Sequence, residues 1–343
     1  MIINMPNTTT SKVESKLVDL KQNGNAVALG RVLTLVILAD EANPADAKHD
    51  KHVDVEKAIS AANQASREHP ARILALTGAG GQEPELDAEV RIGGDAGASE
   101  VVVLNLNGPL RSQSEAVITP LLVPDTPIVA WWPRHAPKYP AEDPVGKAAK
   151  LRITDSNHCE RGDEVLKRLA AGYQPGDTDL AWTRLTGWRA QIAAALDLPP
   201  YEPVTKAVVH GVAHNASSLL LAGWLAVQLG CPTELIPVPG AVGITGVVLE
   251  RASGNIVFSR PDGHILPAQD AGTLSIRQPG YPERHIALPL TSLSEALTEE
   301  LRRLDADRVY EKVLTEGLRL VSRSCPDNGL QLSDGHTAME ESV

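Results

Sequence analysis

Four nearly continuous runs of aliphatic residues constrain the fold of this chain more than any other feature. The runs are rich in Val, Ile and Leu, and segments with a helical spacing of apolar residues lie between them. Strands that are buried on both faces have this composition, whereas half-exposed strands alternate between apolar and polar residues. The runs occupy residues 31–39, 71–77, 100–106 and 127–132. The N-terminal part is therefore predicted to be an α/β domain with a mostly parallel sheet flanked by helices.

The intervening segments agree with this fold. Residues 53–69 and 112–122 are predicted to be helices, and Pro70 ends the first of them. Apolar and charged residues alternate over residues 86–92, which predicts a half-exposed strand at an edge of the sheet. A last strand is expected at residues 151–155.

The second half of the chain has a different pattern. Residues 178–198 follow a Gln-Pro-Gly break and are predicted to form a long connecting helix. The further expected elements are a strand at 204–210, a buried helix near 217–229, short antiparallel strands at 246–251, 255–260, 272–277 and 284–288, and helices at 292–304 and 306–321. This order predicts a smaller α+β domain with an antiparallel meander.

Four parts follow from these patterns. Residues 1–25 are polar and are expected to be a flexible N-terminal segment, and residues 26–173 form the α/β domain. The α+β domain spans residues 174–321. Residues 322–343 are polar and are expected to be a disordered C-terminal tail.

Charge and cysteine content narrow the partners and the compartment. The formal net charge of −11 disfavours binding to nucleic acid or to anionic lipid. Cys159, Cys231 and Cys325 are widely spaced and odd in number, as expected in a reducing compartment. Residues 213–233 carry no charge, but their histidine, asparagine and serines favour a buried helix over a membrane span. A cytoplasmic protein without a membrane partner is predicted.

No set of residues in the sequence predicts catalysis, a metal or a cofactor. The glycines at residues 78–81 precede an alternating strand, whereas a dinucleotide loop opens a helix. His210 and His214 lack a third ligand nearby, so hydrogen bonding and helix capping are the favoured interpretation. Glu299 and Glu300 are interpreted as solvated charges or as charges at a helix cap.

Tryptophans and arginines in two segments are the candidate partner-binding residues. Both types are over-represented at binding hot spots, and ligand sites in α/β sheets gather beyond the carboxyl ends of strands. The candidates are Trp131, Trp132, Trp182, Arg184, Trp188 and Arg189. Arg184 and Trp188 lie one helical turn apart and are expected to stack.

Each segment also has a purely structural interpretation. Trp131 and Trp132 can each cover one face of the sheet, because neighbouring residues on a strand point to opposite sides. Residues 178–198 can be a brace between the two domains, in which case the tryptophans are the sensitive positions. If the segment is instead an interface, alanine at Arg184 or Arg189 weakens partner binding and leaves the fold almost undisturbed.

The same stretches resemble the OpcA family of glucose-6-phosphate dehydrogenase assembly and activator proteins. The matching segments are SREHPARI at residues 66–73, LLVPDTPIVAWWP at 121–133, Asp155-Ser156, DLAWTRLTGWR at 179–189 and LLLAGWL at 219–225. The resemblance implies a non-catalytic protein that binds glucose-6-phosphate dehydrogenase and promotes its oligomerisation or its response to substrate. Relatives from photosynthetic bacteria link cysteines to thioredoxin control, and the unpaired cysteines of this chain depart from that pattern.

A second hypothesis belongs to a different class. The chain could be a stand-alone enzyme or sensor that binds a sugar phosphate or nucleotide at the carboxyl edge of the N-terminal sheet. Arg67, Arg72 and Arg134 are then the expected anion contacts. Turnover or ligand binding by the isolated chain would separate this hypothesis from the first.

Overall fold

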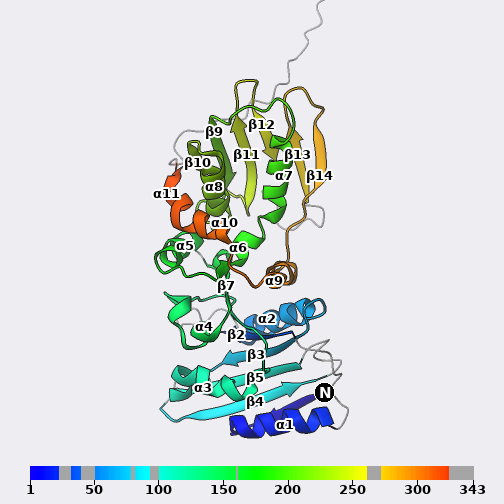
Figure 1. Ribbon diagram of the computed structural model, residues 1–343, viewed down its shortest axis with the longest axis vertical. Coiled ribbons are helices and arrows are strands. Elements are labelled where there is room, and N and C mark those ends of the chain that lie inside the picture. Colours follow the sequence, from blue (N-terminus) through cyan, green and yellow to red (C-terminus); the bar gives the residue numbers. More distant parts are fainter. Residues whose placement is uncertain are drawn as a thin grey trace, which may run out of the picture.

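The computed structural model describes residues 1–22, 32–39, 51–78, 82–92, 100–159, 161–260 and 272–323. Over these residues the molecule is elongated, and its two units are stacked end to end (Figure 1). Each unit is built around its own sheet, of eight strands in the first unit and seven in the second. The prediction of an α/β part followed by an α+β part is confirmed.

Six parallel strands form most of the first sheet, and two antiparallel strands complete it. The spatial order is β1 (Ile2–Met5), β4 (Glu85–Arg91), β5 (Glu100–Asn107), β3 (Ala71–Thr77), β2 (Leu33–Leu38), β6 (Ile128–Trp132), β7 (Leu151–Thr154) and β8 (Asp177–Asp179). The four aliphatic runs are the four central strands of this sheet, where side chains on both faces are buried. Sequence analysis missed β1, which has only four residues, and β8, whose sequence Asp-Thr-Asp resembles that of a loop.

Counted along the chain, the parallel strands lie in the order 3-2-1-4-5-6, which is the order of the dinucleotide-binding fold. In that fold a glycine-rich loop after the first strand holds the pyrophosphate at a helix N-terminus. The sequence after β2 reads Ala-Asp-Glu-Ala-Asn-Pro and has two carboxylates but no glycine. The strand order is thus that of a nucleotide-binding protein, while the sequence after β2 lacks the glycines of a phosphate-binding loop.

The glycine-containing segment after β3 serves close packing. β4 follows it in place of a helix, as the sequence predicts. Gly78 has a φ of +156°, and a Cβ there would lie 1.9 Å from the carbonyl oxygen of Leu106. Only glycine allows this approach of two backbones.

Helices cover both faces of the first sheet. One face packs against α2 (Lys51–Ala65) and α9 (Leu293–Leu301) through residues such as Leu35 and Ile73. The other packs against α1 (Thr10–Gln22), α3 (Ser114–Ile118) and α4 (Pro144–Ala148) through residues such as Val36 and Leu74. Alternate residues of one strand therefore belong to two separate cores.

The expectation of a flexible segment at residues 1–25 is wrong for the described residues 1–22. β1 pairs with β4, and Val13 and Leu17 of α1 are buried in the core. These apolar positions recur at four-residue steps among lysines and glutamates, and the buried stripe stabilises the helix. Because β1 pairs outside β4, β4 is an inner strand and the prediction of an edge position is also wrong.

The second sheet combines an antiparallel meander with parallel strands at one side. Its order is β14 (Arg284–Ala287), β13 (Thr273–Arg277), β12 (Ile256–Ser259), β11 (Ile244–Glu250), β9 (Lys206–Gly211), β10 (Thr233–Pro237) and β15 (Val321–Arg323). The meander and the hairpin between β11 and β12 are confirmed. The predicted C-terminal tail lies outside the described residues except for its first two positions, which belong to β15.

A buried helix organises this second core. α8 (Ala216–Leu229) accounts for the uncharged segment, and Gly223 lies against Gly317, where a Cβ would be 2.7 Å from the Gly223 carbonyl oxygen. Gly317 ends the π-helical turn Val313–Gly317, which continues α10 (Arg308–Lys312) and leads into α11 (Leu318–Leu320). None of the described helices combines the length and the apolar character that crossing a membrane requires.

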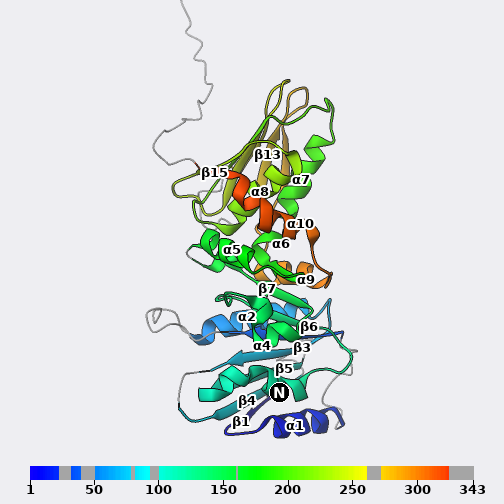
Figure 2. The same cartoon turned by 60° about the vertical axis from the view of Figure 1, so that its left-hand side comes forward.

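The two units are connected more closely than the predicted division at residues 173 and 174 suggests. β8 follows that division and still belongs to the first sheet. α9 belongs by sequence to the second unit, yet it lies next to α2 of the first unit (Figure 2). Its residues Ala296, Leu297 and Leu301 pack in the core of that unit. The C-terminal part of the chain therefore crosses back and ties the two units together.

Candidate functional site

The adjacent tryptophans at the end of β6 are both inside the protein. Trp131 is 0% exposed and packs with α2 and α9, whereas Trp132 is 3% exposed and packs on the opposite face. Of the two interpretations, the geometry favours the structural one, in which each ring covers one face of the sheet. Neither ring presents a surface to a partner.

Residues 178–198 do not form one helix. The segment begins as β8, turns into α6 (Leu180–Thr183) and continues after a break as α7 (Thr186–Leu196). The side chain of Asp179 accepts the backbone N–H of Ala181 and so starts α6 directly at the end of the strand. The prediction of a single long helix is wrong because a strand end and a helix cap, both at Asp179, lie within the predicted range.

The break in the helix also changes which groups stack. The predicted contact between Arg184 and Trp188 is absent from the described contacts, and the guanidinium of Arg189 lies 3.7 Å from the centre of the Trp182 ring instead. Trp188 is covered by Arg260, 5.3 Å from its ring centre. Both tryptophans are almost fully buried in the second core. They fit the brace interpretation of this segment.

Arg184 belongs to a buried ion cluster between the two units. Its two terminal nitrogens donate to the two oxygens of Asp155 at 2.7 and 2.8 Å. His158 Nδ1 lies 2.8 Å from the same carboxylate, which is 2% exposed as a residue. Burial alone would raise the pKa of Asp155, but the hydrogen bonds from His158 and Arg184 outweigh it and hold the pKa below its ordinary value. The expectation that Arg184 is an exposed contact is therefore wrong.

A second carboxylate lies beside this pair. Asp179 is fully buried and accepts hydrogen bonds from Thr154 Oγ1 at 2.6 Å and from Ser156 Oγ at 2.5 Å. Burial, together with the negative charge of Asp155, raises its pKa. Perturbed carboxyl pairs occur in active sites, but they also occur in structural networks, and here the contacts join the ends of β7 and β8 to the turn at residues 155–158 and to residues 181–184. We call Asp155, Asp179, Arg184 and His158 the junction cluster.

The three arginines predicted to bind an anion do not meet. Arg72 starts β3 and is 6% exposed, with Glu100 at 3.2 Å and the Leu121 carbonyl at 2.6 Å as its partners. Arg67 is exposed and precedes β3, so it lies with Arg72 at the amino edge of the parallel strands. Arg134 follows β6 at the carboxyl edge. These positions lie at opposite edges, so the three residues do not form the anion site of the second hypothesis.

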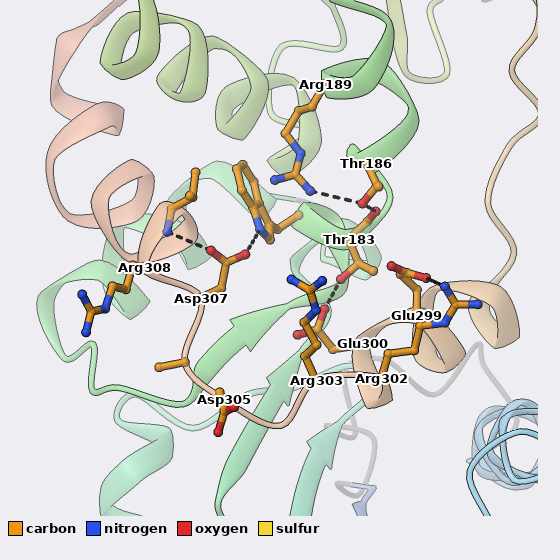
Figure 3. A pocket seen from close by; sticks show the side chains of 13 residues that line it. Thr183, Thr186, Arg189, Glu299, Glu300, Arg302, Arg303, Asp305, Asp307 and Arg308 are labelled. Atoms are coloured by element: carbon orange, nitrogen blue, oxygen red, sulfur yellow. Dashed lines mark hydrogen bonds and ion pairs between the residues drawn. The ribbon is translucent and has the colours of Figure 1, made fainter. Parts of the chain in front are cut away.

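A cavity of about 700 Å³ lies next to the junction cluster. Residues between 182 and 189 form one side of it. Residues between 299 and 309, from the end of α9 to the start of α10, form the other side (Figure 3). Because α6 follows β8 directly, Trp182 and Thr183 place this cavity beyond the carboxyl end of a parallel strand. Ligand sites of open α/β sheets lie in this region.

Each carboxyl group of the cavity already has a partner within the protein. Asp307 accepts from Trp182 Nε1 at 2.8 Å and caps α10, and Asp305 lies 3.1 Å from Lys150. Glu299 pairs with Arg302 at 3.1 Å. Glu300 accepts from the Thr183 hydroxyl, and burial raises its pKa. The interpretation of Glu300 as a solvated charge is wrong.

The arginines of the cavity are less completely paired. Over the described residues, Arg303 and Arg308 have no ion pair or side-chain hydrogen bond. Arg189 donates to Thr186 Oγ1 at 3.1 Å, while its Nε is buried without a partner and burial lowers the pKa of the guanidinium. Sequence analysis missed Arg302, Arg303 and Arg308, although the dense charges of LRRLDADRVYEK at residues 301–312 were a signal.

The other sequence candidates have local partners. His214 Nδ1 lies 3.3 Å from Asp163, whose other neighbour is Arg323 at 2.6 Å, and burial lowers the pKa of His210. Among the residues with described side chains, no group of three or more His, Cys, Asp or Glu is arranged to hold a metal ion. Burial raises the pKa values of the Cys159 and Cys231 thiols, and Cys325 lies outside the described residues.

Comparison with known protein families gives two matches in chain order. Residues 62–171 match the model for the glucose-6-phosphate dehydrogenase subunit N-terminal domain, named for OpcA. Residues 175–314 match the model for the C-terminal domain of the same subunit. No curated protein matches the chain.

Among solved structures the similarity is low. Glucose-6-phosphate 1-dehydrogenase from Mycobacterium avium has 10% identity and a TM-score of 0.40, over 85% of this chain and 93% of that one. A Gfo/Idh/MocA family oxidoreductase from Vibrio cholerae has 9% identity and a TM-score of 0.35, over 83% and 95%. A structure described as trehalose-6-phosphate from E. coli bound with UDP-2-fluoro glucose has 10% identity and a TM-score of 0.24. The match covers 60% of this chain, and the chain spans 64% of the length of that one. These values are too low to carry an argument about function.

Proposed function

The chain belongs to the OpcA family of glucose-6-phosphate dehydrogenase subunits, and on that premise we propose that it is a non-catalytic subunit which binds the dehydrogenase and promotes its oligomerisation or its response to substrate. The observation that carries the proposal is the match of both family models, which together cover residues 62–171 and 175–314 of the chain. A cytoplasmic location is part of the proposal, since the dehydrogenase is the partner.

The first sheet supports a non-catalytic role. Its parallel strands have the order of a dinucleotide-binding fold, yet the sequence that follows β2 contains two carboxylates and none of the phosphate-binding glycines. Trp131 and Trp132 fill both cores at the end of β6, which is the neighbour of β2 at the point where the strand order reverses. A nicotinamide cofactor bound in the usual manner would need glycines after β2 and a site at the end of β6 that the two tryptophans do not fill.

The connection between the two units supports a role as a scaffold. The junction cluster and α9 hold the units together through buried charges and a shared core. A rigid subunit can favour one state of its partner when it contacts that state better than the others. A preference of about 1.4 kcal/mol changes the populations of the two states tenfold.

The test combines association with kinetics. The purified chain is mixed with its dehydrogenase, and the complex is measured by size-exclusion chromatography with light scattering. We expect a complex, together with a lower apparent substrate constant or a higher maximal rate, and no turnover when the dehydrogenase is omitted. An Arg319→Ala variant, which changes one exposed arginine away from the junction and the cavity, controls for unspecific charge effects. Absence of a complex at micromolar concentrations, or glucose-6-phosphate oxidation by the chain alone, would contradict the proposal.

A further inference from the structure

The cavity beside the junction cluster contains more unpaired cations than unpaired carboxylates. Asp305 and Glu299 are ion-paired with Lys150 and Arg302, whereas Asp307 and Glu300 accept hydrogen bonds from the uncharged groups of Trp182 and Thr183. Arg303 and Arg308 have no partner among the described residues. The raised pKa of Glu300 further favours its neutral form. The cavity is therefore suited to an anion.

Arg189 is the most unusual of these cations. It is half-buried over the Trp182 ring, and its only described side-chain hydrogen bond goes to a threonine hydroxyl. A guanidinium that has lost part of its hydration without gaining a carboxylate is energetically unfavourable unless another anion approaches it. Its buried Nε is without a partner.

The geometry directs two of the arginines into the same space. In Figure 3 the side chains of Arg189 and Arg303 extend from opposite walls towards the middle of the cavity, whereas Arg308 lies to one side. Arg302 is turned towards Glu299 and is occupied by it. Two guanidinium groups facing one space are a typical arrangement for binding a phosphate group.

We propose that this cavity binds a phosphomonoester of a small hydroxylated molecule, with Arg189 and Arg303 as the phosphate contacts and Arg308 as a weaker one. A volume of about 700 Å³ holds more than a phosphate ion and lies within the usual range for small-molecule sites. Thr186 and the carboxyl groups of Glu299 and Asp307 supply the hydrogen-bonding groups that hydroxyls require. The site differs in place and residues from the one expected at Arg67, Arg72 and Arg134.

The consequence for the molecule is a link between two distant segments. A ligand here contacts residues 182–189 and residues 299–309 at once, and α9 packs on the first sheet while α6 and α7 pack in the second core. Occupancy would therefore stabilise the relative position of the two units. The site belongs to the chain itself and does not require the dehydrogenase.

The experiment measures binding to the isolated chain by calorimetry at low ionic strength. Glycerol phosphate and inorganic phosphate are the two probes, and glycerol is the uncharged control. We expect glycerol phosphate to bind more tightly than inorganic phosphate. We expect Arg303→Ala to weaken the affinity for glycerol phosphate at least tenfold. Adding Arg308→Ala should weaken this affinity further.

Matched controls keep the result interpretable. Arg303 and Arg308 are exposed, so their variants are expected to keep the wild-type melting temperature. Arg319→Ala, with an equally exposed arginine outside the cavity, should bind like the wild type. Stronger binding of inorganic phosphate than of glycerol phosphate would indicate a simple anion site and contradict the inference. So would no binding of either probe, or binding that Arg303→Ala leaves unchanged. Each of these results leaves the association test with the dehydrogenase untouched.

Discussion

The junction cluster and the neighbouring cavity both contain arginines and carboxyl groups, but the arginines are paired in the cluster and largely unpaired in the cavity. In the junction cluster, Arg184 is held by both oxygens of a carboxylate that has almost no contact with water. In the cavity, Arg189 stacks on a ring, and Arg303 has no described partner. A paired buried charge fixes the fold, whereas an unpaired cation beside an open space is available for recognition. The two arginines of the segment 179–189 thus have different roles although they lie five residues apart.

Removal of Arg184 is expected to have the largest effect. Arg184→Ala leaves Asp155 buried with only His158 as a partner, which should cost about 3–5 kcal/mol of the free energy of unfolding. Arg189→Ala removes only a stacking contact and one hydrogen bond, and should cost about 1 kcal/mol. Urea denaturation of both variants measures the difference. Equal costs at the two positions would break the distinction between the cluster and the cavity.

Trp182→Phe tests the connection between the cavity and the core. The substitution keeps a ring under Arg189 but removes the N–H that donates to Asp307 at 2.8 Å. The cost should be about 1–3 kcal/mol, because Asp307 remains half-buried with one hydrogen bond fewer. Calorimetric unfolding measures it, and Asp307→Asn in the Trp182→Phe background should then add less than it does alone. Full additivity would show that the two groups act independently.

The dependence of stability on pH should differ in sign between Asp155 of the junction cluster and Glu300 of the cavity. Asp155 has a lowered pKa, so its contribution is present above the ordinary aspartate value of about 3.9 and is lost as the pH falls. Glu300 has a raised pKa, so its contribution is full below about 4.3 and is lost as the pH rises towards its folded value. The free energy of unfolding is measured for the wild type and for Glu300→Gln from pH 4 to 8. The difference, wild type minus variant, should fall as the pH rises, because the stabilising contribution of Glu300 is lost. A flat difference would show that Glu300 is ionised in the folded protein at neutral pH.

Oxidation should have the smallest effect. Cys159 lies near the junction cluster and donates to the Arg134 carbonyl at 3.3 Å, whereas Cys231 lies in the second unit. Raised pKa values leave little thiolate at neutral pH, and the thiolate is the reactive form. Activation of the dehydrogenase by the chain should be the same with and without reductant. A reversible loss of activation that a single Cys→Ser change abolishes would contradict this prediction.

Periodicity determined the central part of the fold in advance. The run at residues 71–77 became β3 with identical bounds, and the run at 127–132 became β6, because a strand buried on both faces requires an uninterrupted aliphatic sequence. The meander of the second unit followed in the same way from alternation and turn residues. β1 and β8 could not be predicted, since they have only four and three residues and depend on pairing with a neighbouring strand.

The sequence by itself determined which kinds of residue carry the unusual chemistry, and the tertiary structure decided what each of them does. Tryptophans and arginines in the segment 179–189 are recognisable without coordinates, and so is the family to which the segment belongs. Pairing of Arg184 with Asp155 joins positions 29 residues apart, and the cavity joins Arg189 to a segment more than 100 residues further along the chain. Local patterns report on neighbours within a few residues. Which charge meets its counter-ion depends on the packing of whole units, and this no local pattern contains.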